Sequence, residues 1–115
     1  DILRPRIAVW VKAKAYTHEQ FTLEELASSL YTNKTYLSTF IKDEYDMNFS
    51  GWVASLRIDE AKRIMMKEPE KRLQEVAFEC GFSSLAYFSS VFSKSEGISP
   101  SAWQREFSRK TDGEQ

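Results

Sequence analysis

The sequence predicts an all-α fold of seven helices, in which two helix-turn-helix units are joined by a long central linker helix. Three observations support this prediction. No segment alternates apolar and polar residues with the period of two that a half-buried strand requires. Apolar residues instead recur at the three- and four-residue spacing of amphipathic helices. A pattern roughly fifty residues long also occurs twice, which is the signature of an internal repeat.

The two copies of the repeat are residues 23–52 and 73–103. Each copy predicts two short helices that cross at a small alanine and are joined by a tight turn. The second helix of such a pair is the element that enters a DNA major groove. Equivalent positions carry the same or similar side chains: Ala27 and Ala77, Asn33 and Ser83, Tyr36 and Tyr87, and Trp52 and Trp103.

The first expected helix covers residues 5–16. Pro5 suits the first turn, where its missing N–H costs no intrahelical hydrogen bond. The spacing of Ile7, Trp10 and Val11 places these side chains on the core.

The second expected helix covers residues 23–30 and starts from a capping box. Thr22 is its N-cap, and Glu25 follows three residues later to bond back to the cap. Its buried stripe consists of Leu23, Leu26, Ala27 and Leu30.

The third expected helix, residues 34–45, follows a turn at Tyr31 and Thr32 and is capped by Asn33. It is the recognition helix of the first unit. We expect an inward face of Tyr36, Leu37, Phe40 and Ile41. We expect an outward face, rich in hydroxyls and flanked by lysines, of Lys34, Thr35, Ser38, Thr39 and Lys42.

The central helix is expected over residues 49–67, capped by Asn48 and ended by Pro69. Its apolar residues recur at helical spacing along its length. A run of cations gives it a basic side, which we expect to be solvated and offset by nearby carboxylates. These cations are Arg57, Lys62, Arg63 and Lys67.

The second unit is expected to contain helices over 72–80 and 84–95, joined by a turn at Gly81 and with Ser83 as N-cap of the later helix. The inward positions of this second recognition helix are Tyr87, Phe88, Val91 and Phe92. The outward positions are Ser84, Leu85, Ala86, Ser89, Ser90, Ser93 and Lys94.

A final helix follows the dipeptide Ser99-Pro100, an N-cap and a first-turn proline, and is expected to reach Phe107. Residues 108–115 form a polar tail. The whole chain, 1–115, is thus expected to be one domain. Its two subdomains, about 5–48 and 70–108, are bridged by helix 49–67.

The composition argues against enzymes and metal-binding proteins. The single cysteine, Cys80, forms no internal disulfide, and we interpret it as a small buried apolar residue. His18 is the only histidine, so the chain lacks the residues for a catalytic triad or a histidine-based metal site. No phosphate-binding loop is present. We therefore expect no enzyme activity, no cofactor and no metal.

The 115 residues begin at Asp1, and we expect them to be a fragment of a longer protein. No apolar run is long enough to span a bilayer or to resemble a signal peptide. The expected location is the cytoplasm. The net charge is −1 with a pI near 5.9, which is unusually acidic for a DNA-binding domain and predicts modest non-specific affinity for phosphate.

Over about residues 5–108, the chain resembles the C-terminal DNA-binding domain of AraC/XylS-type transcriptional regulators. In the most specific stretch, alanine, Gly-Phe, Tyr-Phe, glycine and Ser-Pro all fall at the family's spacings. The matching segments are EELA at 24–27, NKTYLSTFIK at 33–42, LRIDEAKRIM at 56–65 and EVAFECGFSSLAYFSSVFSKSEGISPSAW at 75–103.

The resemblance implies sequence-specific binding of double-stranded DNA, with the two recognition helices in successive major grooves. It implies base contacts from Thr35, Ser38, Thr39, Leu85, Ala86, Ser89 and Ser90, to which we add Lys34. We expect backbone contacts from Asn33, Lys42, Arg57, Ser83, Ser84 and Lys94. The implied partners are a promoter or operator, an N-terminal sensor or regulatory domain, and RNA polymerase. Dimerisation is expected through a part of the protein outside this chain.

The alternative function is a helical protein-interaction domain that keeps the fold and has lost DNA binding. The acidic pI favours it, as does Ser90, which stands where the family often has arginine. Because the outward face at 34–42 carries lysines and hydroxyls, we expect the first unit to contribute more base discrimination than the second.

Overall fold

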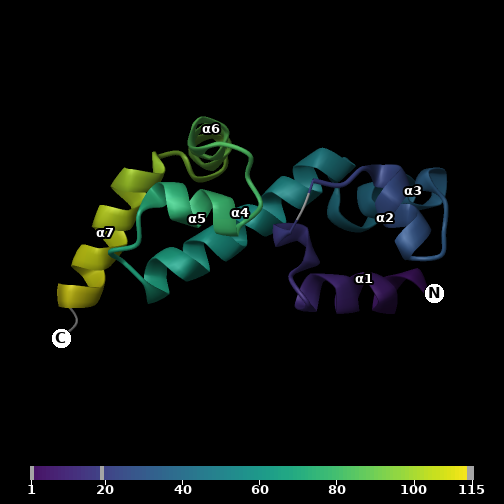
Figure 1. The fold of residues 1–115 in the computed structure, drawn as a ribbon, viewed down its shortest axis with the longest axis horizontal. Helices are drawn as coiled ribbons and strands as arrows, with labels where there is room; N and C mark the ends of the chain where they lie inside the picture. Colours follow the sequence, from purple (N-terminus) through teal and green to yellow (C-terminus); the bar gives the residue numbers. More distant parts are fainter. Residues whose placement is uncertain (1, 19, 114–115) are drawn as a thin grey trace. The chain divides into compact units, whose positions relative to one another are not determined.

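The computed structural model describes residues 2–18 and 20–113, with residues 108–113 described by their backbone alone. Within these residues the chain forms seven α-helices and one short 3-10 helix, without a strand, which confirms the all-α fold (Figure 1). The helices are α1 (Leu3–Lys12), α2 (Leu23–Ser29), α3 (Lys34–Tyr45), α4 (Phe49–Lys67), α5 (Leu73–Glu79), α6 (Leu85–Glu96) and α7 (Pro100–Gly113); the 3-10 helix is η1 (Ala15–Thr17).

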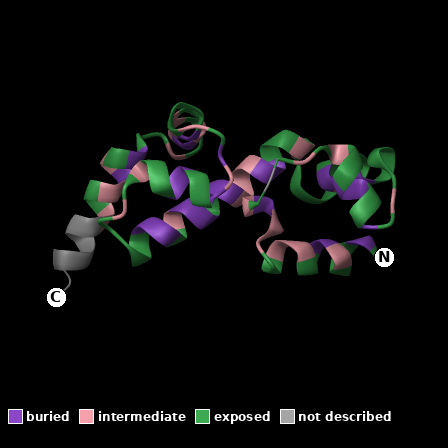
Figure 2. Cartoon of the chain, viewed as in Figure 1, coloured by how far each residue is buried: buried purple, intermediate pink, exposed green. Residues whose placement is uncertain are grey.

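The chain divides into two compact units, residues 1–54 and 55–115, with the boundary inside α4. Buried residues form a core in each (Figure 2). In the first unit, Trp52 stacks on Trp10 at 5.6 Å and on Tyr45 at 5.5 Å between ring centroids. In the second, Trp103 packs edge-on against Phe92 at 5.9 Å. The tryptophans aligned by the repeat thus each anchor the core of one unit.

The turns that connect the paired helices have the same hydrogen-bond pattern in both units. The Thr32 N–H donates to the Ala27 carbonyl at 2.9 Å, and the Phe82 N–H donates to the Ala77 carbonyl at 3.0 Å. Each turn passes through a left-handed residue, Tyr31 (φ 60°) in one unit and Gly81 (φ 98°) in the other. The pattern is a Schellman motif.

A tyrosine in the left-handed region costs about 1–2 kcal/mol relative to glycine. Arg6 from α1 offsets part of this cost in the first unit. Its guanidinium donates to the Leu30 carbonyl at 2.9 Å and lies 5.4 Å from the Tyr31 ring centroid. The turn therefore keeps its geometry although it lacks glycine.

Most predicted helix boundaries are accurate, and α3 and α4 match their predicted ranges. The first helix differs: it begins at Leu3 and ends at Lys12, because Lys14 adopts a left-handed backbone (φ 58°) and the chain continues as η1. The cap of α6 is Ser84 instead of Ser83, with the Ser84 side chain accepting from the Tyr87 N–H at 3.1 Å. The backbone of α7 continues past Phe107 to Gly113.

Helices α3 and α6 each expose a tyrosine that we expected on the inward face. Tyr36 is 52% exposed and Tyr87 is 50% exposed. The prediction was wrong because residues four apart, such as Leu37 and Ile41 in α3, already fill the buried stripe. The residue before Leu37 is rotated by about 100° from it and so turns toward solvent.

The expected solvated basic side of α4 is also wrong in part. Arg57 is 7% exposed, and burial lowers the pKa of its guanidinium. Arg63 donates two hydrogen bonds to the buried Glu60 carboxylate, at 2.8 and 2.9 Å. Lys62 forms an ion pair with Glu96 at 3.1 Å. These three cations lie within the second unit, and the burial of Arg57 departs from the solvated side we expected.

Cys80 is fully buried, as predicted, and burial raises the pKa of its thiol to about 12.

None of the described helices has the length and apolar character needed to cross a membrane.

Candidate nucleic-acid interface

The N-terminus of α3 is capped by the side chain of Asn33. The Asn33 side-chain oxygen accepts a hydrogen bond from the Tyr36 N–H at 2.8 Å, which satisfies one of the free donors of the first turn. The remaining amides and the helix dipole give this end a partial positive charge, which attracts anions such as phosphate.

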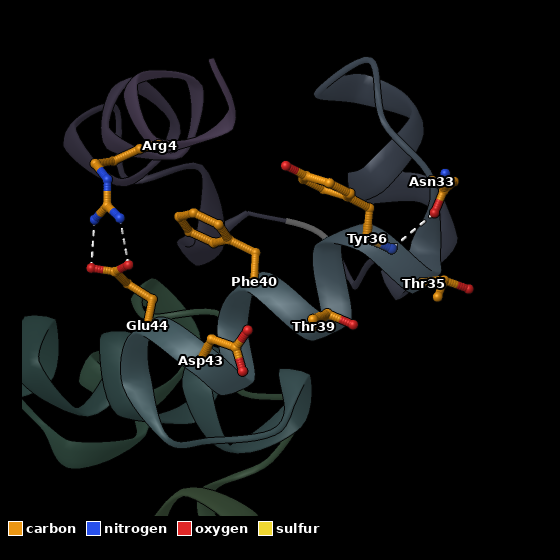
Figure 3. A pocket seen from close by; sticks show the side chains of 8 residues that line it. All are labelled: Arg4, Asn33, Thr35, Tyr36, Thr39, Phe40, Asp43 and Glu44. Carbon is orange, nitrogen blue, oxygen red and sulfur yellow. Dashed lines mark hydrogen bonds and ion pairs between the residues drawn. The ribbon is translucent and has the colours of Figure 1, made fainter. Parts of the chain in front are cut away.

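The outward side chains of α3, which we call the α3 face, are Lys34, Thr35, Ser38, Thr39 and Lys42. All five are exposed. Thr35 and Thr39 lie one turn apart in a single row, visible in Figure 3. Their side chains are short, so the helix backbone can approach a groove closely. Their hydroxyls can donate to or accept from base edges.

The lysines of the α3 face have carboxylate neighbours. Lys34 lies 3.8 Å from Glu24, and Lys42 lies 3.2 Å from Asp46. Both pairs are exposed to solvent, where such ion pairs contribute only about 0–1 kcal/mol. A phosphate can therefore replace either carboxylate at low cost.

One edge of α3 borders a pocket that extends to α1 (Figure 3). In it, the Arg4 guanidinium donates two hydrogen bonds to the Glu44 carboxylate at 2.5 and 2.6 Å and lies 5.4 Å from the Phe40 ring centroid. The hydrogen bonds from Arg4 lower the pKa of Glu44. This pair, which we call the clasp, joins α1 to α3.

Sequence reasoning missed the clasp. Arg4 and Glu44 are forty residues apart, and no local spacing predicts that they meet. The same pocket contains Asp43, which follows Thr39 by one turn and extends the exposed row toward the C-terminus of α3.

Five outward side chains of α6, which we call the α6 face, are Leu85, Ala86, Ser89, Ser90 and Lys94. All are exposed except Ser89, which is half-buried. Leu85 is 39% exposed, a large aliphatic side chain facing solvent beside a row of small ones. Ser84, half-buried, caps the helix, and Ser83 precedes it on the surface.

The chemistry of the two faces differs. The α3 face offers hydroxyls between two lysines, whereas the α6 face offers methyl groups, two serines and one lysine. Thymine methyl groups are the base feature that Leu85 and Ala86 can contact. Among the described residues, no group of three His, Cys, Asp or Glu side chains is placed to hold a metal ion.

Comparison with known proteins relates the chain to transcriptional regulators. Residues 26–106 match the model of a family described as a helix-turn-helix domain. The chain is 33% identical over 90 residues to the uncharacterized HTH-type transcriptional regulator YobQ of Bacillus subtilis, covering 75% of this chain and 37% of that protein. It is 25% identical over 97 residues to the regulatory protein PocR of Salmonella typhimurium, covering 84% of this chain and 32% of that protein.

Two solved structures share the fold. One is the C-terminal domain of AraT, a response regulator from Geobacillus stearothermophilus, with a TM-score of 0.79, 28% identity, and 91% of this chain and 84% of that chain covered. The other is the DNA-binding domain of the transcriptional factor AdpA in complex with a target DNA, with a TM-score of 0.81, 24% identity and 96% of each chain covered. The chain spans about a third of the length of YobQ and of PocR.

Proposed function

Because the chain belongs to the AraC-type helix-turn-helix DNA-binding domains of transcriptional regulators, we propose that α3 and α6 each enter a major groove and together select an operator sequence. This family consists of transcriptional regulators and not of enzymes. The observation that carries the proposal is that the α3 face and the α6 face, at equivalent places in the repeat, are both exposed. Each belongs to a helix whose N-terminus is capped by a side chain.

The α3 face supplies most of the base discrimination. Thr35, Ser38 and Thr39 contact base edges through their hydroxyls, and Lys34 reaches a guanine acceptor at the entrance of the groove. The α6 face contributes thymine methyl contacts from Leu85 and Ala86. Ser89 and Ser90 add hydroxyl contacts.

Backbone contacts position both helices without selecting sequence. Lys42 and Lys94 neutralise phosphates, and the N-termini of the two helices receive phosphates through their free amides. The remaining backbone contacts are Asn33, Ser83 and Ser84. With three exposed lysines on the two faces, the isolated chain binds DNA weakly.

The chain acts as the output domain of a longer bacterial regulator in the cytoplasm. YobQ and PocR are each two to three times its length, which supports a further sensor or regulatory domain. Dimerisation through that part raises the effective concentration of the second DNA-binding domain and so the affinity. RNA polymerase is a further partner of the assembled regulator.

Selection from a random duplex pool, followed by binding measurements on the selected duplex, tests the proposal. Replacing both Ser38 and Thr39 with glutamate puts two negative charges on the α3 face, and we expect binding to be lost. The control places glutamate at Val9, an exposed position on α1, and should bind as the wild type does. Enrichment of no sequence, together with equal binding by all three proteins, would refute the proposal.

The second candidate is a protein-interaction domain that has kept the fold. The net charge of −1 and the absence of a long hydrogen-bond donor at Ser90 favour it. Under this function the double glutamate variant binds DNA no differently from the wild type.

If the chain does select an operator, comparing Thr39→Ala with Ser90→Ala shows which unit contributes more to base discrimination. A larger loss of operator choice for Ser90→Ala would show that the second unit discriminates more.

A further inference from the structure

Tyr36 and Tyr87 occupy the same place in the two recognition helices. Each is the third residue of its helix, and each N–H donates to the cap residue, Asn33 at 2.8 Å or Ser84 at 3.1 Å. Each side chain is about half exposed, 52% for Tyr36 and 50% for Tyr87. Two independent units thus present a phenol group at the same position on the surface.

That position is the edge of the face that enters the groove. A residue three positions before another on an α-helix lies about 60° around the axis from it. Tyr36 is therefore displaced by this angle from Thr39, and Tyr87 from Ser90. A helix that fills a major groove has a phosphate backbone along each side. The tyrosines are placed to face that backbone and not the base edges at the centre of the groove.

The charged groups around Tyr36 do not supply a phosphate contact at this edge (Figure 3). The Arg4 guanidinium is paired with Glu44, and Asp43 adds a second carboxylate to the same pocket. The three charged groups sum to −1, so their net charge opposes a phosphate, although exposure to solvent screens it. A phosphate contact at this edge therefore depends on the hydroxyl of Tyr36, which can donate to a phosphate oxygen.

The charged neighbours of Tyr87 differ from those of Tyr36, although both residues present a phenol group. Lys94 stands at the repeat position of Asp43, on the same exposed side of its helix. The Tyr87 ring packs against Phe82, with 5.7 Å between ring centroids, which holds it at the edge of α6. The tyrosine is thus the feature shared by both edges, whereas the neighbouring charge is not.

We propose that the Tyr36 and Tyr87 hydroxyls each donate a hydrogen bond to a phosphate oxygen of double-stranded DNA, one for each recognition helix. The proposal rests on the proposed function and adds two positioning residues to it. Because phosphates are the same at every base pair, these contacts raise affinity for all duplexes and do not select sequence. Because the phenol is uncharged, they release no counterion.

The test replaces each tyrosine with phenylalanine, which removes the hydroxyl and keeps the ring. Binding is measured by fluorescence anisotropy on a duplex selected by the wild-type chain and on the unselected random pool. We expect each of Y36F and Y87F to bind about tenfold more weakly on both probes. The slope of log K against log salt should stay at the wild-type value. The matched control is Y31F, which removes the hydroxyl of a tyrosine that is 84% exposed but lies in the turn, and it should bind as the wild type does.

Three results would overturn the proposal. Wild-type binding by Y36F and Y87F, with weaker binding by Y36A and Y87A, would show that only the rings contact DNA. A loss confined to the selected duplex would assign the hydroxyls to base recognition. An equal loss in Y31F would indicate a general effect of removing surface hydroxyls. If the wild-type chain binds neither probe, the proposed function itself fails, which separates that failure from the failure of the tyrosine contacts.

Discussion

Replacing Lys42 with alanine should reduce the salt dependence of DNA binding by a defined amount. Two exposed lysines, Lys42 and Lys94, neutralise phosphates in this account. Each phosphate neutralised by a cation contributes about −0.9 to the slope of log K against log salt. The wild-type slope should thus be about −1.8, which is roughly a 12-fold loss of affinity between 50 and 200 mM salt. For Lys42→Ala the slope should be about −0.9, a loss of about 3.5-fold.

The ion pair with Asp46 does not alter this expectation. Lys42 lies 3.2 Å from Asp46, whose side chain is almost fully exposed, so exchange of the carboxylate for a phosphate costs little. Anisotropy titrations of the selected duplex over this salt range give the slopes. Lys12→Ala, in α1, removes the same charge from an exposed position off both faces and should leave the slope unchanged. A wild-type slope near zero, or equal effects of the two substitutions, would refute the reasoning.

Three further predictions concern the fold. Thr22→Ala removes the hydroxyl that accepts from the Glu25 N–H at 3.0 Å in the capping box of α2, and should lower the free energy of unfolding in urea by about 1 kcal/mol. Gly97→Ala should cost about 1 kcal/mol in the same assay, because the backbone is left-handed (φ 82°) although an added Cβ would meet no neighbour within 4 Å. Between pH 9 and 12, the Cys80 thiol ionises in the unfolded chain but stays protonated in the fold, since burial raises its pKa from 9.0 to about 12. The unfolding free energy should therefore fall with rising pH in this range, and less steeply in Cys80→Ala.

Local sequence signals predicted the helices well because their caps and turns depend on nearby residues. Asn33 caps α3, and Thr22 with Glu25 forms the capping box of α2, as expected. The repeat also predicted that Trp52 and Trp103 play equivalent roles, and each is buried in the core of its unit.

The predictions failed where the result depends on the orientation of a side chain or on contacts between residues far apart in the sequence. Tyr36 and Tyr87 are aromatic residues adjacent to the buried stripe, and apolar character alone suggested that they point inward. The burial of Arg57 depends on the packing of α4 in the second unit, which charge spacing along one helix does not reveal. The Arg4 clasp on Glu44 joins residues from different helices, and so lies beyond any local pattern.

The central claim is that the α3 and α6 faces are the surfaces that contact DNA. The most direct test follows the backbone amide resonances of the 115-residue chain by NMR during titration with the selected duplex. We predict that the amides of Thr35, Thr39 and Ser90 shift or broaden, while those of Val9 and Met66, exposed on α1 and α4, stay unchanged. Changes confined to Val9 and Met66, with both faces unaffected, would contradict the account.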